Sequence, residues 1–147
     1  MALVHHAEAE SPAIDPQRPL TARGFEQAAA AADRLRDAGF APRAIWHSGK
    51  LRARQTADAC LRRLNPSAEF RMVRGLRPDD PPGWIRDELR AETRDVLLVG
   101  HIPNVSGVAR ALLPTSRGVP LHGVVIMVRT EDGAWSEALR YPDSDRP

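Results

Sequence analysis

The chain has 147 residues, of which 42% are hydrophobic and 27% charged, and its formal net charge at pH 7 is only +2. This size and composition are typical of one globular domain, which we expect to span residues 1–147. No apolar run approaches the length of a membrane span, and the first residues do not resemble a secretory signal. Basic residues do not alternate with aromatic ones, so a nucleic-acid partner is not indicated. The single cysteine, Cys60, excludes an internal disulfide. We therefore expect a cytoplasmic protein with no membrane partner, whose oligomeric state the sequence leaves open.

Short apolar runs alternate with segments of helical periodicity along most of the chain. The predicted elements, in chain order, are a strand at 2–6, a helix from about 22 to 38, a strand at 43–48, a helix at 50–64, a strand at 69–73, a short helix at 84–92, a strand at 95–101, a helix at 103–113 and two strands at 121–130 and 134–141. Thr21 is the predicted N-cap of the first helix, and Gly39 suits its C-terminal side. The acidic Gly-containing turn at 131–133 predicts a hairpin between the last two strands.

Strands that alternate with helices and then end in a hairpin predict an α/β fold. We expect a three-layer α/β/α domain with a mostly parallel central sheet and a C-terminal antiparallel hairpin. The polar residues 142–147 are predicted to form a loose tail.

Histidines stand at the ends of three predicted strands. The first strand ends at His5 and His6, the second at His47 and Ser48, and the strand at 95–101 ends at His101. In open α/β sheets ligands bind beyond the carboxyl ends of the strands. The sequence therefore predicts a site in which these side chains gather.

Arg52 adds an anion-binding group to the same place, because it lies in the first turn of the helix that follows the second strand. A guanidinium group and the free N–H groups of a helix start together favour phosphate. An imidazole nitrogen can attack phosphorus and hold the phosphoryl group transiently. His6, His101 and Arg52 are therefore the candidate catalytic residues.

Four short motifs occur along the chain: LVHHAEAE at 3–10, RPLTARG at 18–24, HSGKLRARQT at 47–56 and LLVGHIP at 97–103. Their order and spacing carry a resemblance to a known family. Together they resemble the histidine phosphatase superfamily, with its phosphoglycerate mutase-like fold. The small size and the lack of a helical insertion are similar to its bacterial phosphohistidine phosphatase branch. The resemblance covers roughly residues 3–139.

The resemblance implies a role for each matching residue. His6 matches the nucleophile that becomes phosphorylated, and Arg52 and His101 match residues that bind the phosphate. The positions that it implies to be structural are Thr21, Gly24, Ser48, Gln55 and Thr56. It implies a phosphorylated protein or a small phosphorylated compound as substrate, and no cofactor.

Two positions depart from the family pattern. His5 stands where the family has an arginine, and Ala7 stands where it has a glycine. Alanine needs only an ordinary φ there, whereas histidine replaces a permanent charge and two donors by one donor that is often neutral at pH 7. His5 is thus either a weaker phosphate contact or a structural substitute. The two resulting hypotheses are an active phosphatase and a non-catalytic module that binds phosphate or phosphoproteins.

The general acid that protonates the leaving group has no distinctive motif. Asp79 and Asp80, in the loop after the third strand, and Glu8, beside the nucleophile, are the candidates. Phosphohistidine is intrinsically labile, so a weak acid would impair its hydrolysis less than that of an alkyl ester. This argument favours phosphohistidine over a sugar phosphate.

The remaining histidines, Cys60 and Trp84 are not assigned a catalytic role. The histidines lack the helical spacing of zinc ligands, and Arg52 would repel a cation, so no metal site is predicted. We expect His47 at the rim of the site, and Cys60 and Trp84 as packing residues. His122 begins the predicted hairpin strand: it is either a polar residue of an edge strand, which we favour, or, if that strand runs antiparallel, a residue that lines the pocket. His5 and His6 are adjacent in a strand, so we expect their side chains on opposite faces of the sheet.

Overall fold

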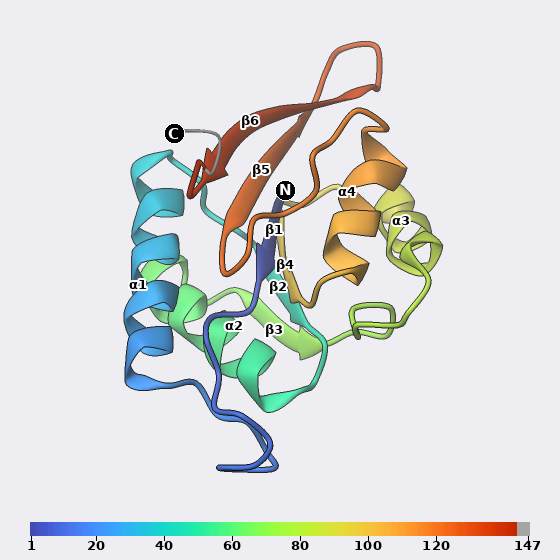
Figure 1. The fold of residues 1–147 in the computed structure, drawn as a ribbon. Helices are drawn as coiled ribbons and strands as arrows, with labels where there is room; N and C mark the ends of the chain where they lie inside the picture. The colour runs from blue at the N-terminus through green and yellow to red at the C-terminus, as the bar shows by residue number, and fades with distance from the viewer. Residues whose placement is uncertain (144–147) are drawn as a thin grey trace.

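The computed structural model describes residues 1–143 (Figure 1). Its elements are β1 (Ala2–His5), α1 (Ala22–Asp37), β2 (Ala44–His47), α2 (Leu51–Leu64), β3 (Glu69–Met72), α3 (Pro82–Ala91), β4 (Val96–Gly100), α4 (Asn104–Leu112), β5 (Val124–Arg129) and β6 (Trp135–Tyr141). Every predicted helix and strand is present, with bounds that differ by a few residues.

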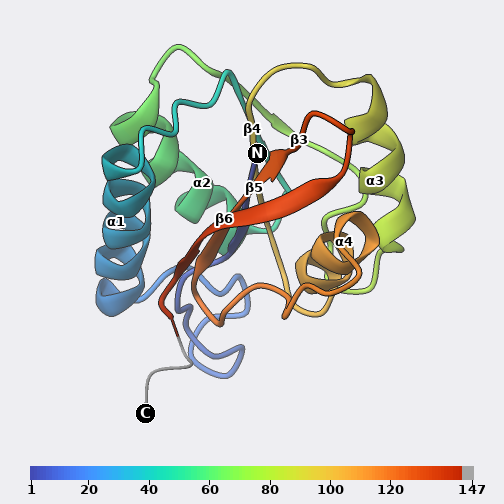
Figure 2. The ribbon, with the colours of Figure 1, turned by 90° about the horizontal axis from the view of Figure 1, so that it is seen from above.

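The six strands form one sheet in the order β3-β2-β4-β1-β5-β6. The first four strands pair in parallel, whereas β5 runs antiparallel to β1 and β6 antiparallel to β5. Helices α1 and α2 cover one face of the sheet and α3 and α4 cover the other (Figures 1 and 2). The predicted three-layer α/β/α architecture, with a mostly parallel sheet and a terminal antiparallel hairpin, is confirmed.

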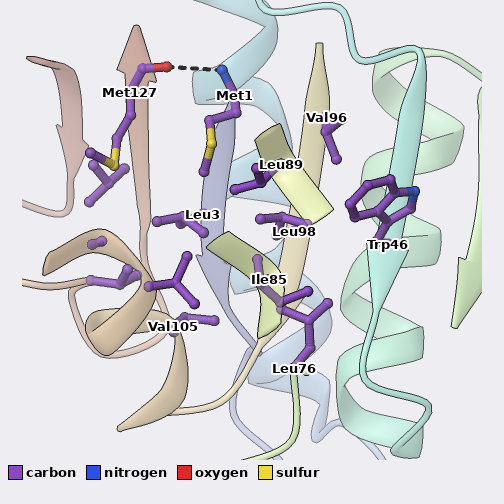
Figure 3. Packing of buried hydrophobic residues seen from close by; sticks show 14 of the residues in the cluster. Met1, Leu3, Trp46, Leu76, Ile85, Leu89, Val96, Leu98, Val105 and Met127 are labelled. Carbon is purple, nitrogen blue, oxygen red and sulfur yellow. Dashed lines mark hydrogen bonds between the residues drawn. The ribbon is translucent and has the colours of Figure 1, made fainter. Parts of the chain in front are cut away.

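Strand β4 lies in the interior of the sheet and is buried on both faces. Leu97 and Val99 pack toward α1 and α2, while Val96 and Leu98 pack toward α3 and α4. On the second face Trp46, from β2, is 1% exposed and lies in the same cluster as Leu98 (Figure 3). Burial on both faces explains why this strand is a continuous apolar run in the sequence.

The loop after β1 is fastened to α1. Thr21 caps the helix by accepting a hydrogen bond from the Gly24 backbone N–H at 2.9 Å, and its own N–H donates to the Glu8 carbonyl at 3.1 Å. A Cβ atom on Gly24 would lie 2.0 Å from that same carbonyl oxygen. Gly24 therefore allows a close approach of helix and loop that no other residue permits.

Two details differ from the sequence-based expectations. Strand β5 begins at Val124 rather than near residue 121, because His122 has a φ of 52° and therefore lies in a turn. Trp84 is 40% exposed and its ring lies under the Arg74 guanidinium at 4.1 Å, so it is not a core residue. Cys60 is fully buried, as expected.

Residues 144–147, most of the predicted loose tail, lie outside the described part of the chain, which ends just after β6. Within the described part, none of the helices is both long and apolar enough to cross a membrane.

Gly24→Ala should destabilise the protein by about 2–4 kcal/mol, because the added methyl group would overlap the Glu8 carbonyl and force helix and loop apart. Urea unfolding measures the loss. Gly39→Ala is the matched control: its φ is +80° but no atom lies within 4 Å of the added Cβ, so it should cost only about 1 kcal/mol. Equal losses in the two variants would contradict this explanation.

Candidate active site

The carboxyl ends of three parallel strands meet at one edge of the sheet. In the pairing register His5 of β1 lies opposite Gly100 of β4, and His47 of β2 lies opposite Val99. Beyond β1, the His6 backbone N–H still donates to the Gly100 carbonyl at 3.0 Å. This register places the residues that follow β1 and β4 next to each other.

The His6 ring is held in one orientation. Its Nδ1 lies 2.7 Å from the Ala7 carbonyl oxygen, which can only accept, so Nδ1 carries the proton. Nε2 consequently has a free lone pair, toward which the Arg52 Nε–H points at 3.3 Å. The Ala7 N–H in turn donates to the Thr56 hydroxyl at 3.0 Å, which fixes the loop. His6 thus presents an unprotonated nitrogen beside a guanidinium group.

His101 lies against His6, with 5.0 Å between the ring centroids. Its Nε2 is 2.7 Å from the Ser48 hydroxyl oxygen, which also accepts from the Lys50 backbone N–H at 3.3 Å. This arrangement favours donation from the Ser48 hydroxyl to Nε2 and leaves the proton of His101 on Nδ1. That Nδ1 is buried and has no hydrogen-bond partner among residues 1–143. Such unpaired buried groups are uncommon and often mark a functional position.

His5 and His122 complete a cluster of four imidazoles. The expectation that His5 and His6 face opposite sides of the sheet is wrong: β1 ends at His5, and the two ring centroids are 4.3 Å apart. The His122 ring stacks on His5 at 5.1 Å, and its Nδ1–H donates to the His6 carbonyl at 2.8 Å. The favoured interpretation of His122 as an edge-strand residue is therefore wrong, and the alternative, that it lies beside the site, is the one the structure shows.

Burial keeps His5, His6 and His101 uncharged. It is the largest cause that lowers the pKa of His6 to about 4, of His101 to about 3 and of His5 to about 2. Neighbouring imidazoles and the Arg52 guanidinium act in the same direction. A bound anion would act in the opposite direction by stabilising the protonated forms. The pocket therefore holds neutral histidines near a permanent positive charge.

Arg18 and Lys50 were missed as site residues by the sequence analysis. The charge of Arg18 contributes to the lowered pKa of His6, His101 and Arg52, and that of Lys50 to the lowered pKa of His101. Arg18 is fixed by donation of its Nε–H to the Glu10 carbonyl at 2.9 Å. Its place in the RPLT motif was the signal that could have identified it.

Two of the three candidate acids, Glu8 and Asp80, are bonded to groups outside the imidazole cluster. Glu8 accepts a hydrogen bond from the Thr21 hydroxyl at 3.0 Å and pairs with Arg23 at 3.9 Å. Asp80 accepts from the backbone N–H groups of residues 75 and 77, and Asp79 is exposed in the same loop. In the described part of the chain no carboxylate hydrogen-bonds to a histidine of the cluster.

A cavity of about 370 Å³ adjoins the cluster at Ser48 and is lined further by Asp80, Arg74, Arg77 and Trp84. His47, expected at the rim of the site, is instead 6% exposed and lies against the Phe70 ring at 5.0 Å.

A metal ion fits the imidazole cluster poorly. One nitrogen each of His5, His6 and His122 lie within 4.8 Å of one another. However, the His5 and His122 rings are stacked within 16° of parallel, so their in-plane lone pairs do not converge on one point. The nearby Arg52 charge also opposes a cation.

Residues 1–78 match the model of the histidine phosphatase superfamily (branch 1), which is just over half of the chain. A search of curated proteins with the whole chain gave no match.

Several solved structures share the fold. The protein histidine phosphatase SixA, complexed with tungstate, is 23% identical over 94% of this chain and 93% of that chain, with a TM-score of 0.82. A protein of Agrobacterium tumefaciens described as a phosphohistidine phosphatase SixA is 24% identical over 92% of both chains, with a TM-score of 0.75. A phosphoserine phosphatase mutant of Entamoeba histolytica, in complex with phosphoserine, is 14% identical over 94% of both chains, with a TM-score of 0.69.

The family match covers β1 and the His6 that follows it, the helix capped by Thr21 and the helix start at Arg52. These parts build the imidazole and guanidinium pocket. The family and the structural similarity to SixA proteins support phosphatase activity. The chain therefore belongs to the histidine phosphatase superfamily, branch 1.

Proposed function

We propose that the protein hydrolyses phosphohistidine, in proteins or in a related phosphorylated substrate, through a phosphorylated His6. The observation that carries this proposal is the orientation of His6. Its Nδ1–H is bonded to the Ala7 carbonyl, and its Nε2 lone pair faces Arg52. A neutral, oriented imidazole beside a cation is what attack on an anionic phosphoryl group requires.

In the proposed first step a phosphoryl oxygen takes the hydrogen bond that Arg52 now gives to Nε2. The lone pair of His6 Nε2 forms the bond to phosphorus, and the bond from phosphorus to the leaving nitrogen breaks. The leaving imidazole takes its proton from solvent. Water then attacks phosphorus, inorganic phosphate leaves, and the bond to Nε2 returns its electron pair to His6.

Arg52 and the Nδ1–H of His101 are proposed to bind the oxygens of the transferred group. The His101 Nδ1 has no partner among the described residues, and its ring lies 5.0 Å from the His6 ring. Ser48 fixes the ring from the opposite nitrogen. Positive charge from Arg18 and Lys50 adds to the attraction for an anion.

The choice of phosphohistidine rests on the leaving group. Within residues 1–143 no carboxylate is bonded to the cluster, so a substrate that needs little acid assistance is favoured. Asp79, Asp80 and Glu8 remain the candidate acids, of which Asp80 lines the adjoining cavity. The histidine phosphatases among the structural neighbours support this substrate class. A role in signal transduction and a cytoplasmic location remain predictions.

The direct test is to trap the intermediate. Wild-type protein mixed with a phosphohistidine peptide labelled with ³²P and quenched in base should retain label on His6, because phosphohistidine survives base. His6→Asn should remove the label and lower kcat/KM by at least about 10³-fold. Turnover unaffected by His6→Asn would overturn the assignment.

His47→Asn is the matched control for that experiment. It replaces another buried histidine at the end of a strand, but His47 contacts the Gly49 N–H and Phe70 rather than the cluster. Label and turnover should persist in this variant.

The lowered pKa of His6 gives a prediction of its own. Since burial lowers that pKa to about 4, the ring should stay neutral, and competent to attack, as the pH falls from 8 to about 5. NMR titration of ¹⁵N-labelled histidines, with His6→Asn for assignment, should place the midpoint near 4. A midpoint near 6.5, the value of an exposed histidine, would contradict the role of burial.

A second candidate function is a module that binds phosphate or phosphoproteins without turnover. The observation that favours it is His5, a neutral residue in an arginine's place, with a pKa lowered to about 2 chiefly by burial. It predicts vanadate binding without hydrolysis, and His5→Arg should then raise activity strongly from near zero. Robust hydrolysis by the wild type would eliminate this alternative.

A further inference from the structure

His5 is held by an unusual donor. The backbone N–H of His122 donates to its Nδ1 at 2.8 Å, across 117 residues of sequence. A ring nitrogen that accepts this bond carries no proton, so the neutral His5 ring has its proton on Nε2. No protein group in the described part of the chain hydrogen-bonds to that Nε2. Its N–H is consequently available to a ligand.

The conformation of His122 makes this bond possible. Its φ of 52° is in the left-handed region, which residues other than glycine seldom adopt. The side chain holds the residue there, because its Nδ1–H donates to the His6 carbonyl at 2.8 Å and its ring stacks on His5. One residue thus contacts the backbone of the nucleophile with its side chain and the neighbouring ring with its backbone.

The described neighbours that shift the pKa of His5 all oppose a positive charge on its ring. His6 and His122 lie in ring contact, and His101 and Arg52 are near enough to oppose a charge on His5. Protonation of Nδ1 would also direct it against the His122 N–H. The geometry therefore maintains a single, uncharged donor where the family has a guanidinium group.

We propose that His122 is a positioning residue that locks His5 as the Nε2–H tautomer and so makes His5 a neutral oxyanion donor. The proposal deepens the proposed function and rests on it for its effect on turnover. In this proposal the Nε2–H of His5 donates in a fixed direction at the position where the family has an arginine. Arg52 supplies the positive charge of the pocket.

The test combines tautomer and rate. In the wild type, ¹⁵N NMR of labelled histidines should show His5 as the Nε2–H tautomer. His122→Gly removes the ring and the bond to the His6 carbonyl, so these contacts no longer hold residue 122 in the conformation from which its N–H reaches His5. It should give His5 a mixture of tautomers and lower kcat/KM about 10–100-fold. His122→Asn, which tolerates the left-handed conformation and retains a short donor, should recover part of that loss.

Two further variants separate positioning from folding. Leu121→Ala, at an exposed neighbouring residue, should leave the tautomer and the rate unchanged. In a His5→Asn background, where the accepting atom belongs to an amide, His122→Gly should cost much less than in the wild type. An equal cost in both backgrounds, or an unchanged His5 tautomer in His122→Gly, would overturn the proposal. Absence of turnover in the wild type would refute the proposed function and the donor role, while the NMR result would still decide the tautomer lock.

Discussion

The parallel pairing of β1 with β4 is the constraint on which the site depends. It sets His5 level with Gly100, lets the His6 N–H bond to the Gly100 carbonyl, and brings His101 beside His6. Since side chains alternate along a strand, a slip of one residue would exchange the faces of Leu3 and Val4 as well as displace the histidines. The two hydrophobic clusters that fix the register therefore also fix the pocket.

Around this register the chain builds a cluster of buried imidazoles, each oriented by a carbonyl, a hydroxyl or a backbone N–H. The Ala7 carbonyl orients His6, the Ser48 hydroxyl orients His101, and the His122 N–H orients His5. Burial keeps the rings neutral and Arg52 supplies permanent charge. The same low polarity that suppresses protonation strengthens the attraction between an entering anion and these groups. A neutral His6 imidazole beside the positive charge of Arg52 therefore follows from one set of contacts.

The sequence was sufficient for the fold because its signals are local. Apolar runs, Thr21 at a helix start and prolines after helices define the elements, and the order of elements restricts the topology. The histidines at the ends of β1 and β4 also followed from the strand pattern. The contacts that the sequence did not predict depend on where strands end and how turns bend. His122 reaches the site because its left-handed conformation places it in a turn, and His5 contacts His6 because β1 ends at His5. Trp84 was wrongly predicted to pack in the core, because the helical pattern alone does not show whether an apolar side chain is buried or exposed.

The most direct measurement is a crystal structure of the protein with vanadate, an anion that mimics phosphorus under attack. The proposed function predicts vanadium bonded to His6 Nε2, with oxygens bound by Arg52, by Nδ1 of His101 and by Nε2 of His5. Vanadate bound elsewhere, or held in the pocket with His6 turned away from it, would contradict the assignment of His6 as nucleophile.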